Sequence, residues 1–220
     1  MAARGGMSRA QRIIIFIIAI IMVVGTIGSF VVIIIGNNNA EQGRAELTKL
    51  EAQYQAKVDA QTKQLSDKYY AQFSAYQSQV APFDKASVTS LQQQDLVVGT
   101  EGEPLTTNSS FPAYYIGWNP DGKVFDSSID STTTPPSLKA PLSVTPGGVI
   151  EGWTNGVVGM KAGGVRLLTI PTDQAYGSTG QGSDIPPNTP LKFIIMVIPT
   201  PETIQPSQEL INLYQQYGSQ

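Results

Sequence analysis

The hydrophobic and polar positions follow different patterns along the chain, and the first pattern is an uninterrupted apolar run. Residues 13–35 read IIIFIIAIIMVVGTIGSFVVIII and contain no charged side chain. At about 1.5 Å per residue a helix of this length spans roughly 34 Å, which is enough to cross a hydrocarbon core of about 30 Å. The run therefore predicts a transmembrane helix.

A cleaved signal peptide is the alternative for this run, because Arg4, Arg9 and Arg12 precede it. Apolar regions of signal peptides are about 7 to 15 residues long and end at small residues before the cleavage site. This run is longer and is followed by GNNNAEQ, so an uncleaved anchor is favoured. Basic flanks stay cytoplasmic. We therefore expect residues 1–12 inside and the rest of the chain on the extracytoplasmic face of the cytoplasmic membrane.

A helical pattern follows the apolar run. Gaps of three and four, with Gln61 filling one slot, separate Leu47, Leu50, Tyr54, Val58, Leu65, Tyr69, Phe73, Tyr76 and Val80. Proline is absent from residues 36–81, so residues 36–90 are expected to form a spacer and linker containing a helix of up to about 40 residues. This helix is either a solvated spacer packed on the domain or a parallel coiled coil. The stripe is rich in Tyr rather than Leu or Ile, which favours at most a weak homodimer.

From about residue 91 the chain changes to short β-branched runs separated by Gly, Pro, Asn and Asp. The runs include AYYIGWNPDGKVFDSS, VRLLTIP and LKFIIMVIP. They predict an antiparallel sheet, with a hairpin turn at NPDGK. Only GWTNGVVGMKAGG is helical in pattern, for about two turns that close at Gly163 and Gly164. The predicted fold class is α+β, with one sheet around one short helix, and residues 201–220 could end the chain as another short helix.

Composition excludes several classes of function. The chain has no histidine and no cysteine, so a typical zinc site or a Ser/His or Cys/His catalytic pair cannot be built. It carries 14 basic and 17 acidic residues. All the acidic residues follow the apolar run, so the outer part is net acidic and nucleic acid is an unfavourable partner.

The stretch VIEGWTNGVVGM places a tryptophan between glycines. Gly152 and Gly156 each cost a helix roughly 1 kcal/mol relative to alanine, which predicts that something approaches the backbone closely beside Trp153. An ordinary buried indole is the alternative interpretation.

The ordered motifs YYIGWNPDGKVFDSS, VIEGWTNGVVGMKAGG and LTIPTDQAYGSTGQGSDIPPNTPLKF resemble the FKBP family of peptidyl-prolyl cis/trans isomerases over about residues 93–200. The chain is similar to a membrane-anchored bacterial-type member. The resemblance implies a bent antiparallel sheet wrapped around one short α-helix, an isomerase domain over residues 91–200, and an apolar pocket for a proline ring. It implies no metal or cofactor.

The resemblance also implies which residues form the pocket, with Trp153 as its floor. The catalytic set would be Tyr115, Phe125, Asp126, Trp153, Tyr176 and Phe193, and further substrate contacts would come from Val149, Ile150, Leu142, Ile185 and Asp184. The Ile150 backbone N–H and the Tyr176 hydroxyl would donate hydrogen bonds to carbonyls of the bound peptide. Without the ordered motifs, these aromatic residues would be interpreted as ordinary core or amphipathic surface residues.

The chain departs from the family pattern at four positions. Leu142 stands where an aromatic residue is frequent, and Ser131 stands where a basic residue often supports the pocket aspartate. Gln181 and Asp184 occupy loop positions that are often histidine and apolar, respectively. Asp184 either leaves the pocket rim open or caps its own turn. These departures bear on the level of activity rather than on the fold.

The function expected is a membrane-anchored isomerase that assists the folding of exported proteins by binding proline-containing segments. Rotation about a peptide bond meets a barrier of about 18 to 20 kcal/mol, and a pocket that binds the twisted amide best lowers that barrier without proton transfer. The alternatives are a non-catalytic chaperone or scaffold module that holds proline segments, and a structural membrane-tethered spacer.

Overall fold

The computed structural model describes residues 38–217. The predicted basic tail over residues 1–12 and the predicted membrane helix over residues 13–35 lie outside the described residues. Within the described range, no helix combines the length and apolar character needed to cross a bilayer. The chain divides into two compact units, Met1–Glu46 and Leu47–Gln220. The second unit contains the whole sheet.

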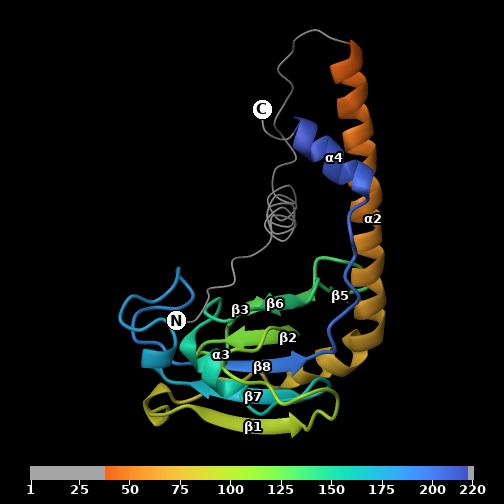
Figure 1. Cartoon of the computed structure of the whole chain (residues 1–220). Coiled ribbons are helices and arrows are strands. Elements are labelled where there is room, and N and C mark those ends of the chain that lie inside the picture. Colours follow the sequence, from red (N-terminus) through yellow and green to blue (C-terminus); the bar gives the residue numbers. More distant parts are fainter. Residues whose placement is uncertain (1–37, 218–220) are drawn as a thin grey trace, which may run out of the picture. The chain divides into compact units, whose positions relative to one another are not determined.

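One antiparallel sheet of six strands forms the centre of the second unit (Figure 1). Its strands lie in the order β1 (Gln92–Val97), β7 (Val165–Ile170), β8 (Leu191–Val197), β2 (Phe111–Trp118) and β3 (Val124–Ser127), while β6 (Leu142–Val144) pairs with the first residues of β2. A separate ribbon consists of β4 (Ile129–Asp130) and β5 (Ser137–Leu138). The predicted antiparallel sheet with one short helix is therefore confirmed.

The long helix agrees with the predicted length, and the short helix ends earlier than predicted. The long helix α2 spans Asn38–Ser74 and continues as a 3-10 turn, η1, over Ala75–Gln79, and a second 3-10 turn, η2, covers Lys85–Ser87. The short helix α3 spans only Glu151–Gly156. The chain then turns at Gly159 and Gly163, which have φ of 82° and 84°, so the predicted closure of the helix at Gly163 and Gly164 is wrong. Beyond it lie the 3-10 turn η3 (Thr172–Gln174) and helix α4 (Gln208–Tyr217).

The sheet is buried on both faces. Along β8, Phe193 and Ile195 belong to the core on the α3 side, whereas Ile194 and Met196 belong to a second core that includes Phe73 of α2. A strand buried on both faces needs apolar residues at consecutive positions, which explains the unbroken run FIIMVI. Helix α2 covers this second face, which agrees with the alternative that the spacer helix packs on the domain.

The last turns of α2 form part of the folded domain. Phe73 is fully buried, and the rings of Tyr69 and Phe73 lie 6.1 and 5.9 Å from the ring of Tyr114 on β2. The Ser66 hydroxyl accepts a hydrogen bond of 2.8 Å from the Leu138 backbone N–H. The stripe on this part of α2 is therefore packed against the chain's own sheet.

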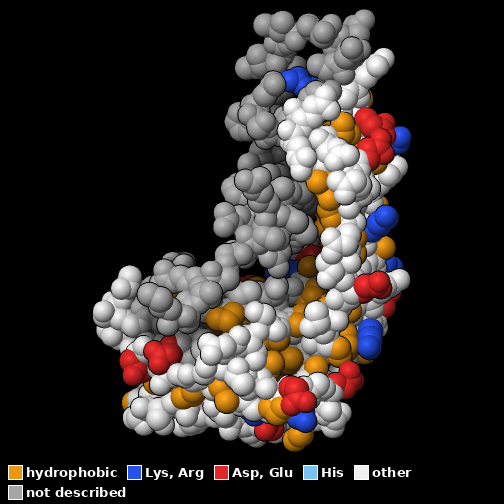
Figure 2. Space-filling model, viewed as in Figure 1, with side chains coloured by type: hydrophobic (Ala, Val, Ile, Leu, Met, Phe, Trp, Pro, Cys, Tyr) orange, Lys and Arg blue, Asp and Glu red, His pale blue; other side chains and the backbone are white. Residues whose placement is uncertain are grey.

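The C-terminal segment packs on an earlier part of α2. The Tyr54 hydroxyl donates to the Ile204 carbonyl, and Tyr214 of α4 donates to the Glu51 carboxylate. Leu50 and Leu210 are both buried. The exposed side of α2 carries side chains of both charges with no block of one sign (Figure 2). A coiled-coil dimer would have to displace these contacts from the predicted stripe.

We predict that replacing Phe73 by alanine lowers the free energy of unfolding by about 3 to 5 kcal/mol, because it leaves a cavity between α2 and the sheet. The measurement is urea unfolding followed by circular dichroism. Lys57→Ala on the exposed side of α2 is the control and should change stability by less than about 0.5 kcal/mol. Equal stabilities for the two variants would show that α2 is not part of the core.

Candidate active site

A pocket of about 140 Å³ opens on the α3 side of the sheet. It is lined by residues of β2, β3 and β6, the start of α3, the segment after η3, and β8. The lining residues are Tyr115, Phe125, Asp126, Leu142, Gly148, Val149, Ile150, Trp153, Tyr176 and Phe193. All predicted site residues except Asp184 and Ile185 are thus brought together around one cavity.

Two glycines let α3 lie directly against β7. A Cβ atom on Gly152 would come within 2.2 Å of Ile170 Cγ2, and one on Gly156 would come within 2.5 Å of Leu168 Cδ1. Real side chains never approach so closely. The sequence predicted a close approach beside Trp153, and the approaching group is the sheet.

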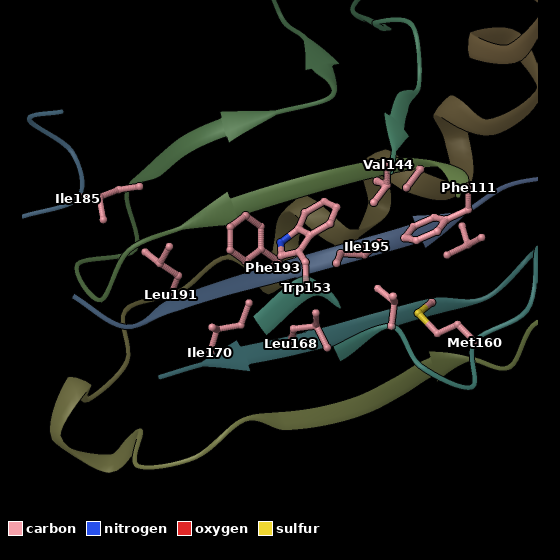
Figure 3. Close-up of a cluster of buried hydrophobic side chains, with 13 residues drawn as sticks. Phe111, Val144, Trp153, Met160, Leu168, Ile170, Ile185, Leu191, Phe193 and Ile195 are labelled. Carbon is pink, nitrogen blue, oxygen red and sulfur yellow. The ribbon is translucent and has the colours of Figure 1, made fainter. Parts of the chain in front are cut away.

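The aromatic rings of the pocket meet edge to face. Trp153 is 4% exposed, and its ring centroid lies 5.4 Å from that of Tyr115 and 5.3 Å from that of Phe193, at interplanar angles of 77° and 84°. Phe193 meets Phe125 in the same way, at 5.5 Å and 81°. Figure 3 shows Trp153 beside Phe193. Gly117 leaves space for both phenylalanine rings, because a Cβ there would lie 2.5 Å from Phe193. Such pairs hold the indole in one orientation.

A hydrogen-bonded pair of polar side chains lies at the pocket rim. The Tyr115 hydroxyl donates to Asp126 Oδ2 at 2.5 Å, and the Ser127 backbone N–H donates to Asp126 Oδ1 at 2.8 Å. Burial, and then this bond to Asp126, raises the pKa of the Tyr115 hydroxyl above its ordinary value. Tyr115 is therefore a neutral donor that fixes the carboxylate.

Two further donors in the pocket lack a protein acceptor among the described residues. The Tyr176 hydroxyl has no hydrogen-bond partner there, and burial, followed by the charge of Asp126, raises its pKa. Ile150 precedes α3 with ψ of 153°, and its carbonyl accepts hydrogen bonds from Trp153 and Thr154. Its own N–H is one of the unpaired groups at the start of a helix. Both donors can therefore bind carbonyl groups of a ligand.

Asp184 and Ile185 do not line the pocket. The Asp184 carboxylate pairs with Lys123 Nζ at 2.5 Å, and this hydrogen bond lowers the pKa of Asp184. Ile185 is 4% exposed and packs into the core on the α3 side. Contact of these two residues with substrate stays a prediction. The ion pair could not be foreseen, because it joins residues distant in sequence.

The positions that depart from the family pattern lie in different surroundings. Leu142 is 36% exposed and lines the open side of the pocket. Ser131 and Gln181 are exposed and do not line it. In the described part of the chain, Asp126 has no ion-pair partner.

The sequence did not predict Gly148 as a pocket residue, although the Gly-Gly pair before Val149 was a signal for a tight turn.

A larger cavity of about 630 Å³ lies apart from these residues, between α2 and the β4–β5 turn with Pro135 and Pro136. It holds none of the aromatic pocket residues. Within residues 38–217 no cluster of acidic side chains is arranged to hold a metal ion.

Comparison with known proteins places this pocket in a family. The model of the FKBP-type peptidyl-prolyl cis-trans isomerases matches residues 103–198. An FK506-binding protein of Neisseria meningitidis serogroup C is 39% identical over 99 residues, which are 44% of this chain and 84% of that protein. A probable FKBP-type peptidyl-prolyl cis-trans isomerase of Haemophilus influenzae is 30% identical over 153 residues, covering 68% of this chain and 58% of that protein.

Among solved structures, a peptidyl-prolyl cis-trans isomerase from Pseudomonas syringae pv. tomato is 35% identical. The match covers 51% of this chain and 76% of that one, with a TM-score of 0.42. All the residues that line the aromatic pocket lie within the span that the family model matches. The chain belongs to the family of FKBP-type peptidyl-prolyl cis-trans isomerases.

Proposed function

We propose that this isomerase is anchored in the cytoplasmic membrane by residues 13–35 and assists the folding of exported proteins on the extracytoplasmic face. The observation that carries the catalytic part is the aromatic pocket around Trp153, whose size and apolar walls suit a proline ring. The apolar run and the preceding arginines support the location.

The pocket lowers the rotation barrier through binding alone. The proline ring lies on the Trp153 indole between the rings of Tyr115 and Phe193. Water otherwise stabilises the charge-separated planar amide, so removing the X-Pro carbonyl from water favours the twisted form. Interactions stronger in that form than in either planar isomer raise kcat.

The polar groups hold the peptide on both sides of the rotating bond. The Tyr176 hydroxyl and the Ile150 N–H donate to backbone carbonyls of the substrate, which fixes one part of the peptide while the other turns. The Tyr115–Asp126 bond keeps the rim in place and prevents either side chain from swinging into the cavity. No step requires a proton to leave the enzyme.

We predict that Trp153→Leu lowers kcat/KM for an Ala-Pro peptide by more than about 30-fold, because truncating a buried aromatic anchor costs about 2 kcal/mol or more. Tyr176→Phe removes one hydrogen bond and should lower it by roughly 2- to 13-fold. The exposed Val158→Ala is the control and should leave it unchanged. A protease-coupled isomerisation assay measures all three.

The same assay separates catalysis from passive binding. A non-catalytic module is favoured by one observation, that Asp126 has no ion-pair partner in the described part of the chain. If the chain binds the Ala-Pro peptide but does not accelerate its isomerisation, the binding-module function stands and the catalytic one is excluded.

We predict that activity stays constant as pH rises from about 7 to 9.5. Tyrosine ordinarily titrates near about 10, and the pKa values of Tyr115 and Tyr176 are raised, so both hydroxyls keep their protons over this range. The unfolded chain releases these protons first. The contribution of these two raised pKa values to the free energy of unfolding is therefore complete below about pH 10. It declines as pH rises through the folded-state pKa values. A loss of activity below pH 9.5 that disappears in Tyr176→Phe would contradict this assignment.

We predict that protease added to spheroplasts removes the isomerase domain and leaves the amino terminus protected. The physical reason is that the basic flank at Arg4, Arg9 and Arg12 stays inside. Immunoblotting with tags at each end of the chain measures the cleavage. Protection of the domain with cleavage of the amino terminus would reverse the topology.

A further inference from the structure

One loop joins two walls of the pocket. Tyr176 precedes residues 177–188, which we call the site loop, and Phe193 follows them on β8. The position of this loop therefore affects where the Tyr176 hydroxyl lies. This residue is half-buried, and its hydroxyl has no hydrogen-bond partner in the described part of the chain.

A buried amide connects the site loop to the β2–β3 turn, residues 119–123. Asn119 is 5% exposed. Its Oδ1 accepts hydrogen bonds from the backbone N–H groups of Asp121 and Lys123 at 3.1 and 3.0 Å. Its Nδ2 donates to the carbonyl of Asp184 in the site loop at 3.1 Å. One side chain thus closes its own turn and binds the loop across from it.

Hydrogen bonds within the loop extend this connection to Tyr176. The Gln181 N–H donates to the Ile185 carbonyl at 2.8 Å, next to the residue that Asn119 binds. The Gly180 N–H donates to the Tyr176 carbonyl at 3.1 Å. Backbone hydrogen bonds therefore connect Ile185, the neighbour of Asp184, to the backbone of Tyr176.

The ion pair between Lys123 and Asp184 spans the same gap but is open to solvent. The two side chains are 60% and 36% exposed. Exposed pairs contribute little because water and salt screen them, whereas a buried amide left without its acceptor loses a hydrogen bond that water cannot replace. Asn119 is therefore the stronger of the two links.

The β2–β3 turn is itself held from the opposite side. The Phe83 N–H donates to the Pro120 carbonyl at 2.9 Å, and Trp118 Nε1 donates to the Ala81 carbonyl at 3.1 Å. Gly122 lies against Pro82, since a Cβ there would be 2.9 Å from the proline ring. The turn is thus a fixed support to which the loop is attached.

We propose that Asn119 is a positioning residue for the isomerase reaction, because its hydrogen bond to the Asp184 carbonyl holds the site loop so that the Tyr176 hydroxyl stays at the pocket. This inference rests on the proposed role of Tyr176 as a donor to the substrate. Asn119 itself does not line the pocket.

The substitution Asn119→Asp isolates this one bond. An aspartate keeps an oxygen that accepts from the two N–H groups of the turn, so the hairpin is retained. Its second oxygen faces the Asp184 carbonyl where the Nδ2 donor was, so the link to the site loop is lost. Lys123→Gln is the matched control, because it removes only the exposed ion pair.

Hydrogen exchange followed by NMR tests the structural step. The Asn188 N–H donates to the Gly177 carbonyl within the loop at 2.8 Å. Asn119→Asp should speed exchange of the Gln181 and Asn188 amides by roughly tenfold or more, because the loop opens locally. The Lys123 amide, bonded within the turn, should stay protected. Lys123→Gln should leave all three amides nearly unchanged. Unchanged exchange at Gln181 and Asn188 in Asn119→Asp would overturn the proposal.

A double-mutant cycle tests the catalytic step. Asn119→Asp should lower kcat/KM for an Ala-Pro peptide by roughly 2- to 13-fold in the native background, as loss of one hydrogen bond does, and should have no further effect in Tyr176→Phe. Equal losses in both backgrounds would show a general structural effect and overturn the proposal.

The two proposals can fail separately. If Tyr176→Phe leaves kcat/KM unchanged, the donor role of Tyr176 is wrong, and with it the catalytic consequence of Asn119. If Tyr176→Phe lowers kcat/KM but Asn119→Asp does not, the donor role stands and the positioning role of Asn119 is overturned.

Discussion

The close contact between α3 and β7 determines where the aromatic pocket lies. Gly152 and Gly156 have no side chains, so the backbone of α3 lies directly on Ile170 and Leu168. A methyl group at either glycine would force the helix away from the sheet. Trp153 stands between these glycines, so the helix cannot move without moving the indole. The pocket floor is thus fixed by the absence of two side chains.

Both faces of the sheet are buried, so the strands that form the pocket wall are also packed on their other side. Along β2, Tyr115 contributes to the pocket, while its neighbour Tyr114 lies in the core beneath α2. The strand that presents the pocket wall is therefore held from behind by Tyr69 and Phe73. One face of the sheet therefore carries the aromatic pocket, and the other face carries α2. This shared packing gives the enzyme a domain larger than the span that the family model matches.

The sequence allowed the sheet, the short helix and most of the pocket to be predicted, because ordered motifs carry aromatic residues at fixed spacings. It placed the end of α3 too late, since helical pattern does not reveal that the chain turns at Gly159 and Gly163 with positive φ. It did not reveal the ion pair between Asp184 and Lys123, because no local pattern shows a contact across the fold. The unbroken apolar run of β8 was a signal for the packing of α2. A sheet covered on one face would need apolar residues only at alternate positions of that strand.

The placement of the proline ring against Trp153 is the central step of the proposed function, and the chain's two tryptophans permit a direct measurement. The second, Trp118, lies in the other core, and its indole N–H is bonded to the Ala81 carbonyl. Titration with an Ala-Pro peptide, followed by NMR of the two indole N–H signals, should shift the Trp153 signal and leave that of Trp118 in place. A shift of the Trp118 signal with no change at Trp153 would contradict the assignment of the pocket.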